Sequence, residues 1–302
     1  MTAPDGAGVA TGATPAERPL VMGIVNVTPD SFSDGGHWAD TETAVAHGLD
    51  LARQGAEILD VGGESTRPGS RRPSEREELD RVLPVVSALA RAGLRISVDT
   101  MRAGVAAATL DAGAEIVNDV SGGLADPEMI PLVARTGATY VAMHWRGHGE
   151  VMQQHAVYDD VVADVRRELL ERVDAILAAG VAPERLVLDP GLGFAKTPAH
   201  NWQLMAHLRE ITDLPYRVLV GASRKTFLGR LGGVEEPVPP ARRDAATAAT
   251  SLLSAQAGAW AVRVHDVPST LAALQVYEEV AAAATSADGA APDTARGAGA
   301  SA

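Results

Sequence analysis

The sequence contains no cysteine among its 302 residues. Disulfide bonds, thiolate zinc sites and a cysteine nucleophile are therefore excluded, and the absence fits a protein of the reducing cytoplasm. Aromatic residues make up only 4% of the chain, and no apolar stretch is long enough to span a membrane. The formal net charge of -13 argues against a nucleic-acid partner, whose phosphates would be repelled. We expect small-molecule partners, with neither nucleic acid nor membrane bound.

The two ends of the chain differ in composition from the rest, because they are small, polar and rich in Gly, Pro and Ala. Such segments bury too little apolar surface to fold by themselves. We expect disordered tails over residues 1–18 and 285–302. The remaining residues, 19–284, contain enough hydrophobic side chains for one large core and are predicted to form one domain.

The most abundant pattern in the chain is an apolar run that recurs eight times. Ala- and Leu-rich segments of helical spacing alternate with these runs. Continuous Val, Ile and Leu runs that alternate with helices indicate parallel strands buried on both faces. Eight such units in about 250 residues predict an α/β protein with a single (β/α)8 TIM barrel. The predicted strands are Leu20–Val27, Glu57–Gly62, Arg95–Asp99, Glu115–Asp119, Thr139–His144, Arg185–Asp189, Arg217–Gly221 and Trp260–His265.

Local signals mark the ends of several predicted helices. Ser74 and Glu77 have the spacing of a capping box, and Pro84 is expected to kink the helix that follows or to mark a shift in it. Glycines at the ends of three helices are typical left-handed terminators. The predicted helices are Thr41–Ala56, Ser74–Gly93, Arg102–Gly113, Asp126–Gly137 and Tyr158–Gly180.

Polar side chains gather where the predicted strands end, which is where active sites of this fold lie. Three of them, Asp99, Asn118 and Asp189, could converge on one planar, N–H-rich ligand such as an aminopyrimidine or a pterin. The alternative is that each caps the helix after it. The full set is Asn26, Glu64, Asp99, Asn118, His144, Asp189, Lys225, Arg263 and His265.

Basic residues in the predicted loops suggest an anionic ligand, such as a phosphate ester. Thr66 and Arg67 follow a Gly-Gly pair and could bind phosphate, with Asp60 and Glu64 balancing the charge or holding a cation. Arg263 and His265 are two apart and so face the same side of a strand, at the usual phosphate end of this fold. We interpret the remaining loop arginines as solvated surface charges; they are Arg71, Arg72, Arg242 and Arg243.

Seven segments, in chain order, resemble the motifs of the dihydropteroate synthase family: NVTPDSFSDGG, GGESTRPG, SVDT, NDVSGG, LDPGLGF, GASRK and RVHDV. The resemblance extends from about Leu20 to Val280. It implies a transferase of folate biosynthesis that condenses 6-hydroxymethyl-7,8-dihydropterin pyrophosphate with p-aminobenzoate. It also implies a cytoplasmic homodimer, Mg2+ as cofactor and inhibition by sulfonamides, which mimic p-aminobenzoate.

The resemblance also implies roles for individual residues. Asp99, Asp189, Lys225 and Arg263 would be catalytic. The pterin would be held by Asp99, Asn118, Met143, Asp189, Gly221 and Lys225. The pyrophosphate would be held by Asn26, Thr66, Arg67, Arg263 and His265, with Asn26 also a ligand of Mg2+. The p-aminobenzoate would lie among Phe32, Arg67, Pro68, Phe194, Lys225 and Thr226.

Two other functions fit part of the pattern. A pterin-binding methyltransferase that passes a methyl group to a corrinoid would share the Asp and Asn residues at the strand ends. It would not need GGESTRPG, GASRK and RVHDV, whose presence counts against it. A non-catalytic pterin-binding paralogue should have eroded loops, and these loops are intact.

Overall fold

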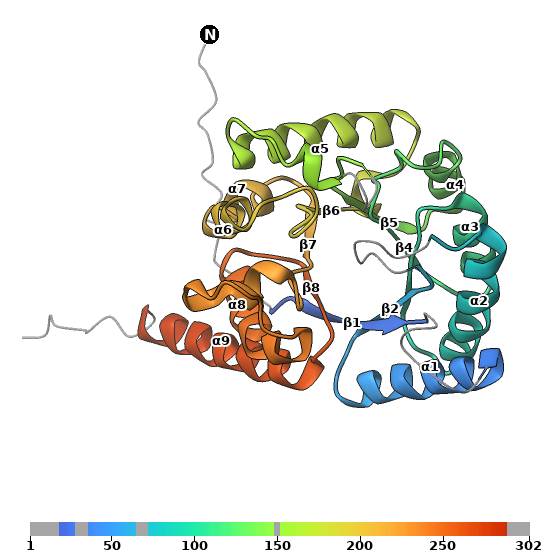
Figure 1. The fold of residues 1–302 in the computed structure, drawn as a ribbon, viewed down its shortest axis with the longest axis horizontal. Coiled ribbons are helices and arrows are strands. Elements are labelled where there is room, and N and C mark those ends of the chain that lie inside the picture. Colours follow the sequence, from blue (N-terminus) through green and yellow to red (C-terminus); the bar gives the residue numbers. More distant parts are fainter. Residues whose placement is uncertain (1–17, 28–35, 65–71, 148–151, 289–302) are drawn as a thin grey trace, which may run out of the picture.

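The computed structural model describes residues 18–27, 36–64, 72–147 and 152–288. Eight parallel strands close into a barrel in chain order, and helices surround it (Figure 1). The predicted TIM barrel is therefore confirmed. The strands are β1 (Leu20–Asn26), β2 (Ile58–Gly62), β3 (Ile96–Asp99), β4 (Ile116–Asp119), β5 (Thr139–Met143), β6 (Leu186–Asp189), β7 (Arg217–Val220) and β8 (Ala261–Val264).

Helices fill most of the connections. Each predicted helix is present, and α1 begins earlier than the predicted start at Thr41. The α-helices are α1 (Gly36–Arg53), α2 (Glu75–Arg91), α3 (Ala103–Asp111), α4 (Met129–Thr136), α5 (Val161–Ala178), α6 (Pro198–Ala206), α7 (Arg209–Thr212), α8 (Asp244–Gln256) and α9 (Val267–Asp288). The short 3-10 helices are η2 (Met152–His155), η3 (Pro183–Arg185), η4 (Thr226–Gly233) and η5 (Pro240–Arg243).

Helix α2 shows how the local signals operate. The Ser74 hydroxyl accepts a hydrogen bond from the Glu77 backbone N–H, and the Glu77 carboxylate accepts one from the Ser74 N–H, so the predicted capping box is present. Pro84 does not divide the helix, which runs unbroken from Glu75 to Arg91. The side chain of Pro84 is exposed, so the hydrogen bond that it cannot donate lies on the solvent side, where water can satisfy the carbonyl.

The barrel interior is apolar at the end where the strands begin. Because side chains alternate along a strand, every second residue points inward. Seven strands contribute one buried apolar residue each to this layer, and β3 contributes Ser97 beside Ile116. This layer closes the barrel from below, so any ligand must enter from the opposite end. The seven residues are Met22, Ile58, Ile116, Val141, Val187, Leu219 and Ala261.

The ends of the domain differ slightly from the predicted boundaries of 19 and 284. Arg18 pairs with Glu57, and α9 continues to Asp288. The other residues of both predicted tails lie outside the described part of the chain, and their disorder stays a prediction. None of the helices that the structure describes is both long and apolar enough to cross a membrane.

Candidate active site at the carboxyl ends of the strands

The strand register brings the predicted polar residues to one level of the barrel. Asn26 aligns with Gly62, Gly62 with Asp99, and Asp99 with Asn118. Across the barrel, Asp189 aligns with Met143. These residues lie at the last or next-to-last positions of their strands, above the apolar layer, so they share one end of the barrel, the mouth.

Arg263 joins two carboxylates inside this mouth. Its Nε donates to Asp60 Oδ2 at 2.6 Å, and its Nη2 donates to Asp99 Oδ2 at 2.7 Å. Burial alone lowers the pKa of Arg263, but the two carboxylates outweigh this effect and hold the pKa above its ordinary value. Asp60 is fully buried and also accepts a hydrogen bond from the Asn118 amide at 3.0 Å. Asp60 therefore fixes the side chains of both neighbours.

The predicted pterin residues lie at this end of the barrel, and the space beside Gly221 and Asp189 is called the slot below. Asn118, Met143 and Asp189 are each less than a tenth exposed. Asp189 uses Oδ1 to accept the Gly191 N–H at 2.7 Å, which sets the orientation of its carboxylate. A Cβ placed on Gly221 would lie 3.8 Å from Asp189 Oδ2, so the missing side chain leaves space directly beside this carboxylate. Burial raises the pKa of Asp189, while Lys225 opposes the shift.

Lys225 and Phe194 form one wall of the mouth. The Lys225 Nζ lies 3.7 Å from the centroid of the Phe194 ring, which is a cation–π distance. Burial, together with the charge of Arg263, lowers the pKa of Lys225 to about 8. Thr226 follows at the exposed start of η4, and its role in an aminobenzoate pocket stays a prediction.

Two non-glycine residues have positive φ among the described residues, and each directly precedes a lysine. Ala195 has φ +47° and comes before Lys196, and Arg224 has φ +57° and comes before Lys225. Such backbone is strained for a residue with a Cβ and persists only where surrounding contacts enforce it. At Arg224 these contacts are two hydrogen bonds from its guanidinium to Asp244, at 2.7 and 2.8 Å.

The predicted phosphate residues are described only in part. His265 lies beside Ser223, with 2.9 Å between Nδ1 and Oγ, and Asn26 is half-buried at the end of β1. Four predicted residues lie outside the described part of the chain: Phe32, Thr66, Arg67 and Pro68.

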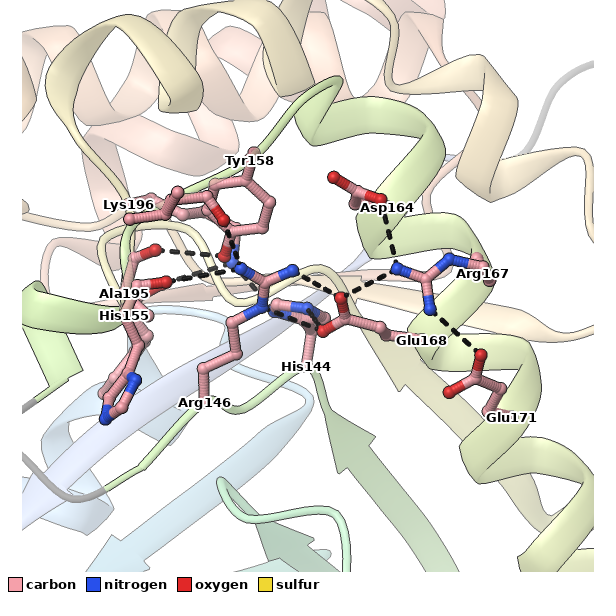
Figure 2. Close-up of polar contacts among 12 residues, drawn as sticks. His144, Arg146, His155, Tyr158, Asp164, Arg167, Glu168, Glu171, Ala195 and Lys196 are labelled. Carbon is pink, nitrogen blue, oxygen red and sulfur yellow. Dashed lines mark hydrogen bonds and ion pairs between the residues drawn. The ribbon is translucent and has the colours of Figure 1, made fainter.

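A second polar cluster lies behind β5 and β6, and Figure 2 shows its members. His144 directly follows β5, and its backbone N–H donates to the Asp189 carbonyl at 2.8 Å. Its ring lies between the Lys196 ammonium and the Glu168 carboxylate. Arg146 donates to Glu168 at 2.9 Å and stacks on the Tyr158 ring, with 3.9 Å between Cζ and the ring centroid. This cluster connects the site to α5.

Sequence reasoning left two residues without their observed roles. Asp60 was considered only as a balancing charge or cation ligand, whereas it is the buried centre of the Arg263 network. The interpretation of Arg243 as a solvated surface charge was wrong. Arg243 is 7% exposed and donates to the carbonyls of Val238 and Arg224, both at 2.7 Å. Buried backbone carbonyls need donors, and no pattern in a single sequence shows which loop arginine reaches them.

The side chains at the mouth decide what kind of metal ion could bind there. Asn26 offers one neutral oxygen, and in the described part of the chain no three His, Asp or Glu side chains group as a metal site would require. A resident hard cation needs several oxygen ligands. These residues fit an ion held chiefly by a phosphate-bearing ligand, to which Asn26 adds one oxygen.

Comparisons with known proteins show the family of the chain. A family model described as a pterin-binding enzyme matches residues 22–265, which defines the class of the protein. The dihydropteroate synthase of Mycobacterium leprae is 55% identical over 259 residues, or 85% of this chain and 91% of that protein. The chain therefore belongs to the dihydropteroate synthase family.

Solved structures of the same family are similar. The Xanthomonas albilineans dihydropteroate synthase with 4-aminobenzoic acid has a TM-score of 0.81 and 48% identity, covering 88% of this chain and 94% of that chain. The same enzyme in complex with 7,8-dihydropteroate gives a TM-score of 0.78 and 46% identity over the same shares of both chains.

Proposed function

We propose that this protein condenses 6-hydroxymethyl-7,8-dihydropterin pyrophosphate with p-aminobenzoate, giving 7,8-dihydropteroate and pyrophosphate. The observation that carries the proposal is the slot, the space that Gly221 leaves beside the buried Asp189 carboxylate and Arg263. Family membership, together with the solved complexes of the Xanthomonas albilineans enzyme with 4-aminobenzoic acid and with 7,8-dihydropteroate, supports the two halves of the reaction.

In this proposal the pterin enters the slot edge-first. The Asp189 carboxylate accepts hydrogen bonds from the amino-pyrimidine edge, and the Asn118 amide both donates and accepts. Asp99 lies on the opposite side, oriented by its ion pair with Arg263. Met143 and Gly221 line the flat faces, where apolar contact and the missing side chain suit an aromatic ring.

The pyrophosphate is assigned to Arg263, His265 and Asn26 and, by family resemblance, to Thr66 and Arg67. The Arg263 side chain is 22% exposed, and its guanidinium has N–H groups beyond those bound to Asp60 and Asp99. Mg2+, when bound with the substrate, would neutralise charge on the departing pyrophosphate. Asn26 would supply one oxygen to it.

The reaction follows from these positions. The C–O bond at the pterin methylene breaks, and the pyrophosphate leaves with the electron pair. Preorganised positive groups lower the energy of the charge that develops on it, while the carboxylates of Asp99 and Asp189 favour the pterin-methyl cation. The amine nitrogen of p-aminobenzoate then forms the new C–N bond and loses a proton to water. Phe194, Lys225 and Thr226 would hold this second substrate, together with Phe32, Arg67 and Pro68.

The setting of the enzyme is also part of the proposal. The cysteine-free composition favours a reducing compartment, so we place the reaction in the cytoplasm. We propose a homodimer formed through the barrel helices. Val276 and Val280 on α9 are more than half exposed, and apolar side chains of this kind support such an interface.

Pyrophosphate release, measured with and without p-aminobenzoate, tests the function. We expect release from the pterin substrate that depends on the arylamine, with 7,8-dihydropteroate formed in equal amount. Binding of the pterin without any release would instead indicate a non-catalytic pterin-binding protein. Methyl transfer to a corrinoid without arylamine-dependent release would indicate the methyltransferase.

A further inference from the structure

Lys196 is a buried lysine to which the reaction above assigns no role. Its side chain is 3% exposed, although it lies only two residues from Phe194 at the mouth. The Nζ donates to the Phe194 carbonyl at 3.2 Å and lies 3.0 Å from His144 Nδ1. Burial of an ammonium group is costly unless it is paired, so its contacts need an explanation.

The donor and the acceptor can be assigned in both side-chain contacts of His144. Its Nε2 lies 2.9 Å from Glu168 Oε2, and a carboxylate can only accept, so Nε2 carries the proton. Nδ1 then accepts from Lys196. Burial, with the nearby charge of Lys196, lowers the pKa of His144 to about 4, which is consistent with a neutral ring. Hydrogen-bond donation therefore runs from Lys196 to His144 and from His144 to Glu168, three residues that Figure 2 draws together.

The same lysine also holds the loop that carries Phe194. This loop has a strained residue, Ala195, whose carbonyl accepts a hydrogen bond from the Tyr158 hydroxyl at 3.0 Å. Earlier in the loop, the Gly193 N–H donates to Asn201 Oδ1 at 2.7 Å. Lys196 supplies the contact to the Phe194 carbonyl itself, and the Phe194 ring faces Lys225 on the other side.

We propose that Lys196 is a positioning residue for the arylamine subsite. Its ammonium, oriented by His144, fixes the Phe194 carbonyl and so sets the angle at which the Phe194 ring faces Lys225. The inference rests on the proposed function, because it takes Phe194 and Lys225 as the walls that frame p-aminobenzoate. Lys196 does not touch the reacting atoms and takes no proton from them.

Lys196→Met provides the first test, since it keeps the apolar stem and removes the donor. We expect KM for p-aminobenzoate to rise by about five- to a hundredfold, the range for a buried polar group left without its hydrogen-bond partner. We expect kcat to change by less than about threefold and pterin affinity to stay within about twofold, because both depend on other side chains. A general loss of structure would lower kcat and pterin binding together. An unchanged KM for the arylamine would overturn the inference.

Two substitutions of His144 give a matched pair that does not alter Lys196. His144→Asn places an oxygen near the position of Nδ1 and keeps the acceptor for Lys196, whereas His144→Gln places its amide near Nε2 and keeps the contact with Glu168. We expect His144→Gln to raise KM for p-aminobenzoate at least about fivefold more than His144→Asn does, as loss of the charged donor's acceptor requires. Equal effects, or the reverse order, would contradict the inference even if Lys196→Met fails to fold.

A double-mutant cycle shows whether Lys196 acts through Phe194. In a Phe194→Ala background, Lys196→Met should raise KM by less than about twofold, because the ring it positions is gone. Effects that multiply in full would overturn the inference. The wild-type protein distinguishes failure of the proposed function from failure of the positioning role. If its pyrophosphate release does not depend on the arylamine, the proposed function is wrong. An active wild type with an unaffected Lys196→Met variant removes the positioning role alone.

Discussion

Arg263 and Asp60 lie 203 positions apart in the sequence and form a buried ion pair inside the barrel, with 2.6 Å between Nε and Oδ2. The pair joins β8 to β2, the two strands that flank β1. Because Asp60 also orients Asn118, and Arg263 also orients Asp99, one buried carboxylate supports three residues assigned to substrates.

Asp60→Asn should therefore destabilise the protein as well as the site. The amide keeps the shape but removes the negative charge, and loss of one partner of a buried pair costs about 3 kcal/mol of the free energy of unfolding. Urea denaturation measures this loss.

Ser97→Ala is the matched control on the adjacent strand, because within the described residues its buried hydroxyl has no hydrogen-bond partner. Its removal should change the free energy by less than about 1 kcal/mol. Equal effects of the two substitutions would contradict the role of Asp60.

Asp189→Asn should weaken pterin binding while the fold survives. The amide oxygen can still accept the Gly191 N–H, but the outward atom becomes a donor that faces donors of the ligand. Mispairing of a buried, charged hydrogen bond costs roughly 1.5–3 kcal/mol, which is about ten- to a hundredfold in affinity. Titration calorimetry with a pterin checks this. Unchanged affinity would show that the pterin lies elsewhere.

Gly221→Ala should weaken pterin binding without lowering the melting temperature of the protein. The added methyl would lie 3.8 Å from Asp189 Oδ2 and 3.9 Å from Arg263 Cβ, both ordinary contacts, so the melting temperature should not fall. The methyl would project into the slot, and overpacking costs about 1–3 kcal/mol, or roughly five- to a hundredfold in pterin affinity. Calorimetric melting and pterin titration on the same sample test both parts. A variant with full affinity would place the pterin away from Gly221.

The stability of the protein should fall as the pH drops from 6.5 towards 4, and His144 should account for part of the loss. Burial first, and then the charge of Lys196, lowers the folded-state pKa of His144 from 6.5 to about 4. Between these values the unfolded chain binds more protons, so acid favours unfolding. The stabilisation from the neutral His144 ring is fully present above pH 6.5. By pH 4 about 3 kcal/mol of the free energy of unfolding has been lost. Denaturation across this range should show a shallower pH slope for His144→Gln than for the wild type; parallel slopes would refute the assignment.

Magnesium should bind weakly to the free protein. Asn26 supplies one neutral oxygen, and an ion of this type keeps most of its shell from water and substrate phosphates. Titration of Mg2+ should therefore give a dissociation constant of about 1 mM or weaker without pyrophosphate, and a much tighter one with it. Asn26→Ala should reduce the second affinity and leave the first unchanged. Tight binding to the free protein would contradict this arrangement.

The sequence predicted the strands well because each is a continuous apolar run bounded by polar residues. The observed strands lie within the predicted ones, and the differences are single residues at the ends, as in Ala261–Val264 within Trp260–His265. Helix ends were also readable where a cap was coded locally, as with Ser74 and Glu77. These features depend on neighbours in the chain, which a sequence displays directly.

Contacts between distant residues could not be predicted in the same way. The type of Arg263 and its place on a strand indicated a functional residue, but nothing local indicated Asp60 as its partner. Arg243 resembled a surface charge because its neighbours are polar, whereas its side chain is buried and donates to the carbonyls of Val238 and Arg224. Lys196 stood in a motif without a role, since its partner His144 lies 52 residues earlier in the chain.

The two strained residues before lysines have a consequence for attempts to make this barrel more heat-resistant. Glycine at Ala195 or Arg224 would relieve the backbone, since it accepts positive φ without a steric penalty. Glycine at either position would make the backbone before Lys196 or Lys225 more flexible. At Arg224 it would also remove the two hydrogen bonds to Asp244. Substitutions that raise thermal stability are therefore tolerated on the outer helices and not at these two turns. At the turns, a change that relieves strain would also disturb the lysines on which catalysis depends.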